Sequence, residues 1–170
     1  MKPPVHEWFE ELFNAHFRHL YRYLNRLSGD ADLAADLAQD AFVRLYRRGA
    51  APDTPVAWLI TVATNLFRNA RGQRSRRIRL LTVARGEGAL ADPAPSPAAS
   101  VETAEATQRV RAALERLPER ERRLLLLRAE GYSYADLAAA LDLHAASVGT
   151  LLARAKRAFR DAFEEPGHAP

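Results

Sequence analysis

The chain has 170 residues and a net charge of +4, which is compatible with a polyanionic partner. It has no cysteine, which excludes disulfides and thiolate metal sites, and no run approaching the ~20 apolar residues that span a bilayer. The N-terminus lacks a signal-peptide core, so we expect a soluble, cytoplasmic protein without membrane insertion. A hydrophobic content of 48% with only 8% aromatic residues favours all-α domains rich in Ala and Leu.

The charge is unevenly distributed along the chain. Residues 1–80 hold 13 basic and 8 acidic side chains, residues 81–108 hold 1 and 4, and residues 109–170 hold 11 and 9. Pro93, Pro95 and Pro97 alternate with small residues in the acidic stretch, which has no apolar period. We therefore predict two small helical domains, 1–80 and 108–165, joined by a flexible linker at 81–107.

The first two predicted helices cover residues 5–27 and 31–48. Apolar side chains recur in both at three- and four-residue steps, and Asp30 is a suitable cap for the second. Six polar side chains point away from the apolar stripe of the second helix: Asp32, Asp36, Gln39, Asp40, Arg44 and Arg47. Acidic residues early and arginines late complement the helix dipole, which alone would explain this pattern.

A third helix is predicted at residues 55–79, after the loop 49–54. Thr54 is a suitable cap for it, and Pro55 suits its first position. Its first half is apolar, whereas its second half carries Arg68, Arg71, Arg74, Arg76, Arg77 and Arg79. A basic run is most often a solvated face, but this switch within one helix favours phosphate binding.

The C-terminal part predicts a helix-turn-helix. A helix from about residue 108 precedes Pro118, which suits the first turn of a second helix because it has no backbone N–H. Gly131 ends this second helix, because glycine readily takes a left-handed backbone. Ser133 and Asp136 form a capping-box pattern for a short helix at 134–141. Asp142 suits a tight turn, and a longer helix follows at 145–163. A short helix, a tight turn and a second helix are typical of DNA-binding domains, although an alanine-rich bundle without a ligand would show the same pattern.

Three motifs resemble bacterial sigma factors of the extracytoplasmic-function (ECF) type. The run LERLPERERRLLLLRAEGYSYADLAAALDL is similar to their C-terminal promoter-binding domain, and DLAQDAF resembles the segment that grips the clamp helices of RNA polymerase. AWLITVATNLFRNARGQRSR resembles the helix that binds the minus-ten element, with Asn69 where the family usually has aspartate. The resemblance covers most of the chain, with the motifs in the family's order.

The resemblance implies a transcription initiation factor without catalytic residues or cofactors. Its partners would be core RNA polymerase, double-stranded promoter DNA and single-stranded minus-ten DNA, and family members are often held inactive by an anti-sigma factor. The residues that match the polymerase-binding segment are Asp36, Gln39, Asp40 and Arg44. Those for the minus-ten element are Asp53, Thr54, Trp58, Asn65, Arg68, Arg71, Arg74, Arg76 and Arg77. Those for the minus-thirty-five element are His144, Ser147, Thr150, Arg154 and Arg157. The linker would thread the polymerase near its active centre.

The second helix of the helix-turn-helix departs from the family pattern. Gly149 stands where the family commonly has lysine, and Leu151 stands where it commonly has arginine. Direct base reading needs side chains with directed donors or acceptors, which are short or weak here. We therefore predict that this domain binds mainly through the DNA backbone and DNA shape.

Two other functional classes stay open at this stage. A stand-alone helix-turn-helix repressor would share the C-terminal domain, but it would not need the DLAQDAF segment. An enzyme is disfavoured, because no nucleophile, base and orienting group assemble and no glycine-rich phosphate loop is present. His16 and His19 lie one turn apart without a carboxylate at matching spacing, so we predict no metal site.

Overall fold

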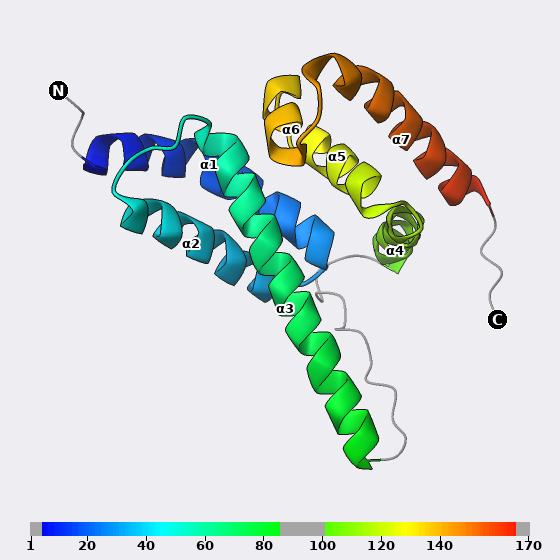
Figure 1. Ribbon diagram of the computed structural model, residues 1–170. Coiled ribbons are helices and arrows are strands. Elements are labelled where there is room, and N and C mark those ends of the chain that lie inside the picture. Colours follow the sequence, from blue (N-terminus) through cyan, green and yellow to red (C-terminus); the bar gives the residue numbers. More distant parts are fainter. Residues whose placement is uncertain (1–4, 86–100, 166–170) are drawn as a thin grey trace. The chain divides into compact units, whose positions relative to one another are not determined.

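The computed structural model describes residues 5–85 and 101–165, and every regular element in these two stretches is a helix (Figure 1). The chain divides into two compact units, Met1–Ala94 and Pro95–Pro170. The first contains α1 (Val5–Ser28), α2 (Ala31–Arg48) and α3 (Pro55–Arg85). The second contains α4 (Val101–Glu115), α5 (Glu119–Ala129), α6 (Tyr134–Leu141), the short 3-10 helix η1 (Ala145–Ser147) and α7 (Val148–Glu164). The predicted all-α class with two helical domains is confirmed.

The three helices of the first unit pack against one another around an apolar core. Leu24, Leu45 and Ile60 come one from each helix, and all three are fully buried. Burial of such a side chain contributes about 1.5–3 kcal/mol. One polar pair lies inside this core, where the hydroxyls of Tyr23 and Thr64 are 3.2 Å apart. This hydrogen bond joins α1 to α3 and helps fix the rotation of α3 about its own axis.

The ends of α2 follow the local signals in the sequence. The Asp30 carboxylate accepts a hydrogen bond from the Leu33 backbone N–H at 3.0 Å. Gly49 ends the helix with a φ of 72°, and its N–H donates to the Tyr46 carbonyl. Each bond satisfies one of the backbone groups that a helix end leaves without an intrahelical partner. Helix α2 has the predicted bounds.

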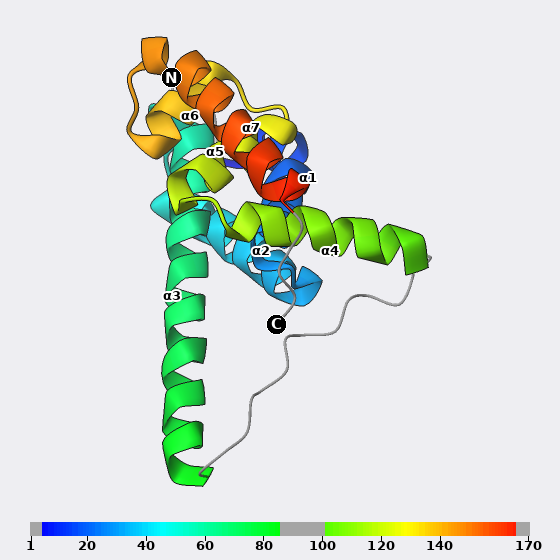
Figure 2. The same ribbon diagram turned by 90° about the vertical axis from the view of Figure 1, so that its right-hand side faces the viewer.

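Helix α3 is longer than predicted, and its second half is exposed over the described residues. The predicted end at residue 79 is wrong, because the helix continues to Arg85. Beyond Phe67, no residue of the described part of α3 is buried, and Leu80 and Val83 are 72% and 87% exposed. Figures 1 and 2 show this half extending past the other two helices of its unit. No proline or glycine stands between Gly72 and Gly86, so nothing in the sequence stops the helix at residue 79.

The second unit is the predicted helix-turn-helix with two supporting helices. Ser133 and Asp136 form the predicted capping box, and Asp142 takes the predicted left-handed backbone with a φ of 52°. Leu137 and Val148 are fully buried beneath the turn. Helix α7 packs against α5, and the C-terminal part of α7 lies beside α4 (Figures 1 and 2).

Three boundaries in this unit differ from the prediction. Residues 101–107, predicted as linker, form the first two turns of α4, whose Ala- and Glu-rich sequence favours helix. Pro118 precedes α5 as its cap and is not in the first turn. Residues 145–147 form a separate 3-10 turn, closed by the Ser147 N–H donating to the His144 carbonyl at 2.9 Å, and α7 starts after it.

The centre of the predicted flexible linker, residues 86–100, lies outside the described residues. Within the described stretches, no single helix is long and apolar enough to cross a membrane. The segments Tyr134–Leu141 and Ala145–Glu164 pass that test of length and composition only as a pair bent by 112°.

Candidate nucleic-acid interface

The polar face of α2 is exposed, as a protein-binding surface must be. Asp36 and Gln39 are exposed, and Asp40, one helical turn after Asp36, has its side chain 45% exposed. The Arg44 Nε lies 3.5 Å from the Asp40 carboxylate, an exposed pair one helical turn apart. Such pairs contribute about 0.3–0.5 kcal/mol, so a partner can displace Arg44 at small cost. The four predicted polymerase-binding residues therefore form one surface.

The N-terminal end of α3 brings together the first group of predicted minus-ten residues. Asp53 and Thr54 are exposed in the loop, and the Thr54 carbonyl accepts a hydrogen bond from the Trp58 backbone N–H at 2.9 Å. Trp58 is half-buried, so part of its ring is available to a ligand. Asn65 and Arg68 lie on the same face of the helix, at 7 and 10 residues from Trp58.

One residue on this face was missed in the sequence analysis. Thr61 is exposed between Trp58 and Asn65, and its hydroxyl donates to the Ala57 carbonyl at 2.8 Å. The oxygen keeps lone pairs that can accept a hydrogen bond from a base or sugar. The three-residue spacing from Trp58 was the signal that would have found it.

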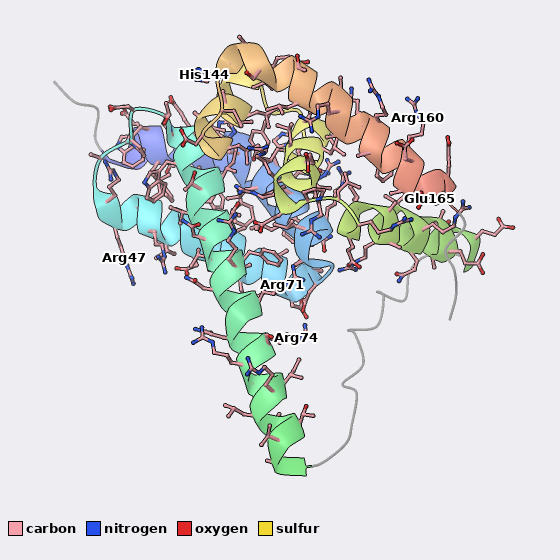
Figure 3. All side chains as sticks on the ribbon, turned by 45° about the vertical axis from the view of Figure 1, so that its right-hand side comes forward. Arg47, Arg71, Arg74, His144, Arg160 and Glu165 are labelled. Carbon is pink, nitrogen blue, oxygen red and sulfur yellow. The ribbon has the colours of Figure 1, made fainter. Side chains whose placement is uncertain are left out.

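The second group of minus-ten residues lies far along the same helix. Arg71, Arg74, Arg76 and Arg77 are all exposed, and Figure 3 labels Arg71 and Arg74 on this half. At 1.5 Å per residue, Arg77 is about 28 Å along the axis from Trp58. The structure therefore separates the predicted residues into an aromatic end and an arginine end, and no acidic side chain lies between Arg68 and Arg85 to offset the charge.

The predicted minus-thirty-five residues lie along one exposed face of the second unit. Ser147, Thr150, Arg154 and Arg157 are exposed at steps of three and four residues. His144 is exposed at the turn before them, and Figure 3 shows it at the start of α7, with Arg160 and Glu165 toward the other end. Leu151 is half-buried, so it lies toward the core and does not belong to this face.

The polar side chains of the described residues form exposed surfaces and no metal-binding cluster. Within residues 5–85 and 101–165, no three His, Asp or Glu side chains gather to hold a metal ion. A hollow of about 290 Å³ in the second unit lies between the turn before α5 and the end of α7 and is lined by Leu117, Pro118, Ala158 and their neighbours.

Two family models match the chain in the places that these surfaces occupy. Sigma-70 region 2 matches residues 12–77, and Sigma-70 region 4 matches residues 107–159. The first match holds the α2 face and the aromatic end of α3, and the second holds the helix-turn-helix.

Curated relatives agree with the family models. The ECF RNA polymerase sigma factor SigE of Mycolicibacterium smegmatis is 30% identical over 90% of this chain, which spans 60% of that relative's length. EcfG of Rhodopseudomonas palustris is 35% identical over 78% of this chain and 70% of its own length. SigL of Mycobacterium tuberculosis is 32% identical over 92% of this chain and 89% of its own length.

Solved structures share the fold. The sigma factor RpoE of Bartonella quintana, solved in complex with the anti-sigma factor NepR, has a TM-score of 0.64 at 22% identity and covers 94% of this chain and 98% of its own. CnrH, solved in complex with the cytosolic domain of CnrY, has a TM-score of 0.60 at 21% identity over 90% and 85%. The chain belongs to the sigma-70 family of RNA polymerase sigma factors. Within that family it is of the ECF type, a transcription initiation factor and not an enzyme.

Proposed function

We propose that three exposed surfaces of this chain carry the three binding functions of a sigma factor. The α2 face of Asp36, Gln39, Asp40 and Arg44 binds core RNA polymerase. The loop 49–54 and α3 bind the minus-ten element, and the exposed face of α7 binds the minus-thirty-five element. The observation that carries the proposal is the position of the acidic α2 face and the helix-turn-helix in the two matched regions, both open to a partner.

The two ends of α3 have different roles in this proposal. The arginine end binds phosphates of the duplex. Guanidinium groups that neutralise phosphates release the counterions condensed on the DNA, and this release favours binding. The aromatic end stabilises the opened strand, since a base that leaves the stack can be held by stacking and hydrogen bonds in a protein pocket. Trp58 supplies the ring for this step, and Asp53, Thr54, Thr61 and Asn65 supply polar atoms around it.

Partners and location follow from the same role. Core RNA polymerase is cytoplasmic in bacteria, so we place the chain in the cytoplasm. The structural relatives include a sigma factor in complex with an anti-sigma factor. An inhibitor of that class would control this chain by covering the polymerase- or DNA-binding faces.

The test is a pull-down of purified core polymerase with the whole chain. The Asp36→Arg and Asp40→Arg double variant should lose most of its binding while retaining its helical circular dichroism. Glu11→Arg, which reverses an exposed charge on α1 instead of α2, is the control and should bind normally. Wild-type affinity in the double variant would refute the α2 assignment. Sequence-specific DNA binding without polymerase would favour the stand-alone repressor.

A further inference from the structure

Gly149 lies in the first turn of α7 and is half-buried, and a side chain from another helix lies over it. A Cβ at Gly149 would be 3.7 Å from Cε2 of Tyr134, which is an ordinary van der Waals contact. Tyr134 is the first residue of α6 and is 47% exposed. An aromatic ring from the first helix of the helix-turn-helix thus borders the backbone of the second, next to Ser147 and Thr150.

A cation is held over the same ring. The guanidinium carbon of Arg128, in the last turn of α5, lies 5.4 Å from the centroid of the Tyr134 ring. Its Nη1 donates a hydrogen bond to the Tyr132 carbonyl at 3.0 Å. The guanidinium is therefore held by this hydrogen bond and by its contact with the Tyr134 ring. Arg128 is exposed, and a guanidinium has five N–H donors, so most of them stay available to a ligand.

We propose that Arg128, positioned by Tyr134, binds a DNA phosphate beside the start of α7 and supplies the positive charge that Gly149 does not. The proposal rests on the role of α7 in binding upstream promoter DNA. A planar, immobilised guanidinium suits a phosphate oxygen pair, since its fork matches that geometry and little side-chain freedom is lost on binding. Arg128 is the DNA-binding residue in this arrangement, and Tyr134 is a positioning residue whose ring, and not its hydroxyl, is needed.

The arrangement also has a purely structural interpretation that the test must separate. An arginine in the last turn of a helix complements the helix dipole, and stacking on an exposed ring stabilises the fold slightly. Loss of either effect would lower the thermal stability of the second unit without changing the salt dependence of DNA binding. The salt slope therefore discriminates between the two roles.

The experiment measures holoenzyme binding to a promoter fragment identified by run-off transcription with the source organism's core polymerase. Arg128→Ala should weaken binding about five- to tenfold and reduce the slope of log affinity against log salt by about 0.9, the contribution of one phosphate. Tyr134→Ala should have a similar effect, Tyr134→Phe almost none, and the Arg128/Tyr134 double alanine variant no more than either single one. Arg120→Ala removes an equally exposed charge from the same helix and should leave the slope unchanged.

Gly149→Lys in the Arg128→Ala background returns a cation to α7 and should restore the slope. An unchanged slope in Arg128→Ala, or a loss confined to one base pair, would overturn the phosphate assignment, and a failed rescue would overturn the link to Gly149. Arg154→Ala tests the underlying function separately. If Arg154→Ala weakens binding and Arg128→Ala does not, only this inference fails, and if neither does, α7 is not the upstream DNA-binding helix.

Discussion

Gly149→Ala and Gly131→Ala make the same chemical change in the second unit, and we expect opposite results. Gly149 has a helical backbone, and the added methyl group would meet the Tyr134 ring at 3.7 Å, without a clash. Alanine is favoured over glycine in a helix by up to about 1 kcal/mol, so Gly149→Ala should stabilise the unit by about 0.5–1 kcal/mol. Gly131 also has open space around it, but its φ of 93° is strained for any L side chain. Gly131→Ala should therefore destabilise the unit by about 1–2 kcal/mol.

The assay uses the distribution of chromophores. Both tryptophans, Trp8 and Trp58, lie in the first unit. Circular dichroism follows both units on heating, whereas tryptophan fluorescence follows only the first. For a unit of this size, 1 kcal/mol corresponds to about 4–8 °C, so a gain of about 0.5–1 kcal/mol from Gly149→Ala should raise the transition of the second unit by about 2–8 °C and leave the fluorescence transition unchanged. Destabilisation by Gly149→Ala, or a neutral Gly131→Ala, would refute the reasoning.

Three further predictions concern binding. Replacing Arg74, Arg76 and Arg77 with Gln should reduce the salt slope of holoenzyme binding to promoter DNA by up to about 2.7, at about 0.9 per phosphate contact, and an unchanged slope would make them a solvated face. Arg154→Ala should weaken binding equally on matched and scrambled upstream elements, as a phosphate contact does; a loss seen only on the matched element would indicate base reading. Ser147→Ala and Thr150→Ala should each cost less than the ~1–3 kcal/mol of a bidentate base contact, and a promoter scan in which recognition of one base disappears with either variant would contradict this.

Helix boundaries could be predicted from the sequence where short-range chemistry decides them. Asp30 and Gly49 mark the ends of α2, and Ser133 with Asp136 marks the start of α6, because caps satisfy backbone groups within four residues. The end of α3 could not be predicted this way. Residues 80–85 contain no stop signal, and the last arginine of the run, Arg79, is not a helix boundary.

The candidate sites could be predicted only in part, for a related reason. Residues on one helix, such as Asp36, Gln39 and Asp40, share a face through spacing alone. Thr61 lies on such a face too, three residues from Trp58, but a neutral hydroxyl does not mark a nucleic-acid site in the sequence as an arginine does. The cluster of Arg128, Tyr134 and Gly149 could not be predicted from the sequence, because its residues come from three helices whose packing the local sequence pattern does not specify.

The two halves of α3 share a continuous helical backbone, so the packed half affects the free energy of helix formation in the exposed half. An isolated helix of its length would be marginal in water, because forming the first turn is unfavourable. Here the packed half, held by Leu59, Ile60 and Phe67, provides that first turn, so each further residue only has to propagate the helix. Repulsion among the arginines opposes propagation, and a polyanion relieves it. Amide hydrogen exchange should therefore quicken steadily from Phe67 toward Arg85 in the free protein, and slow along this stretch when a nucleic acid neutralises the charge.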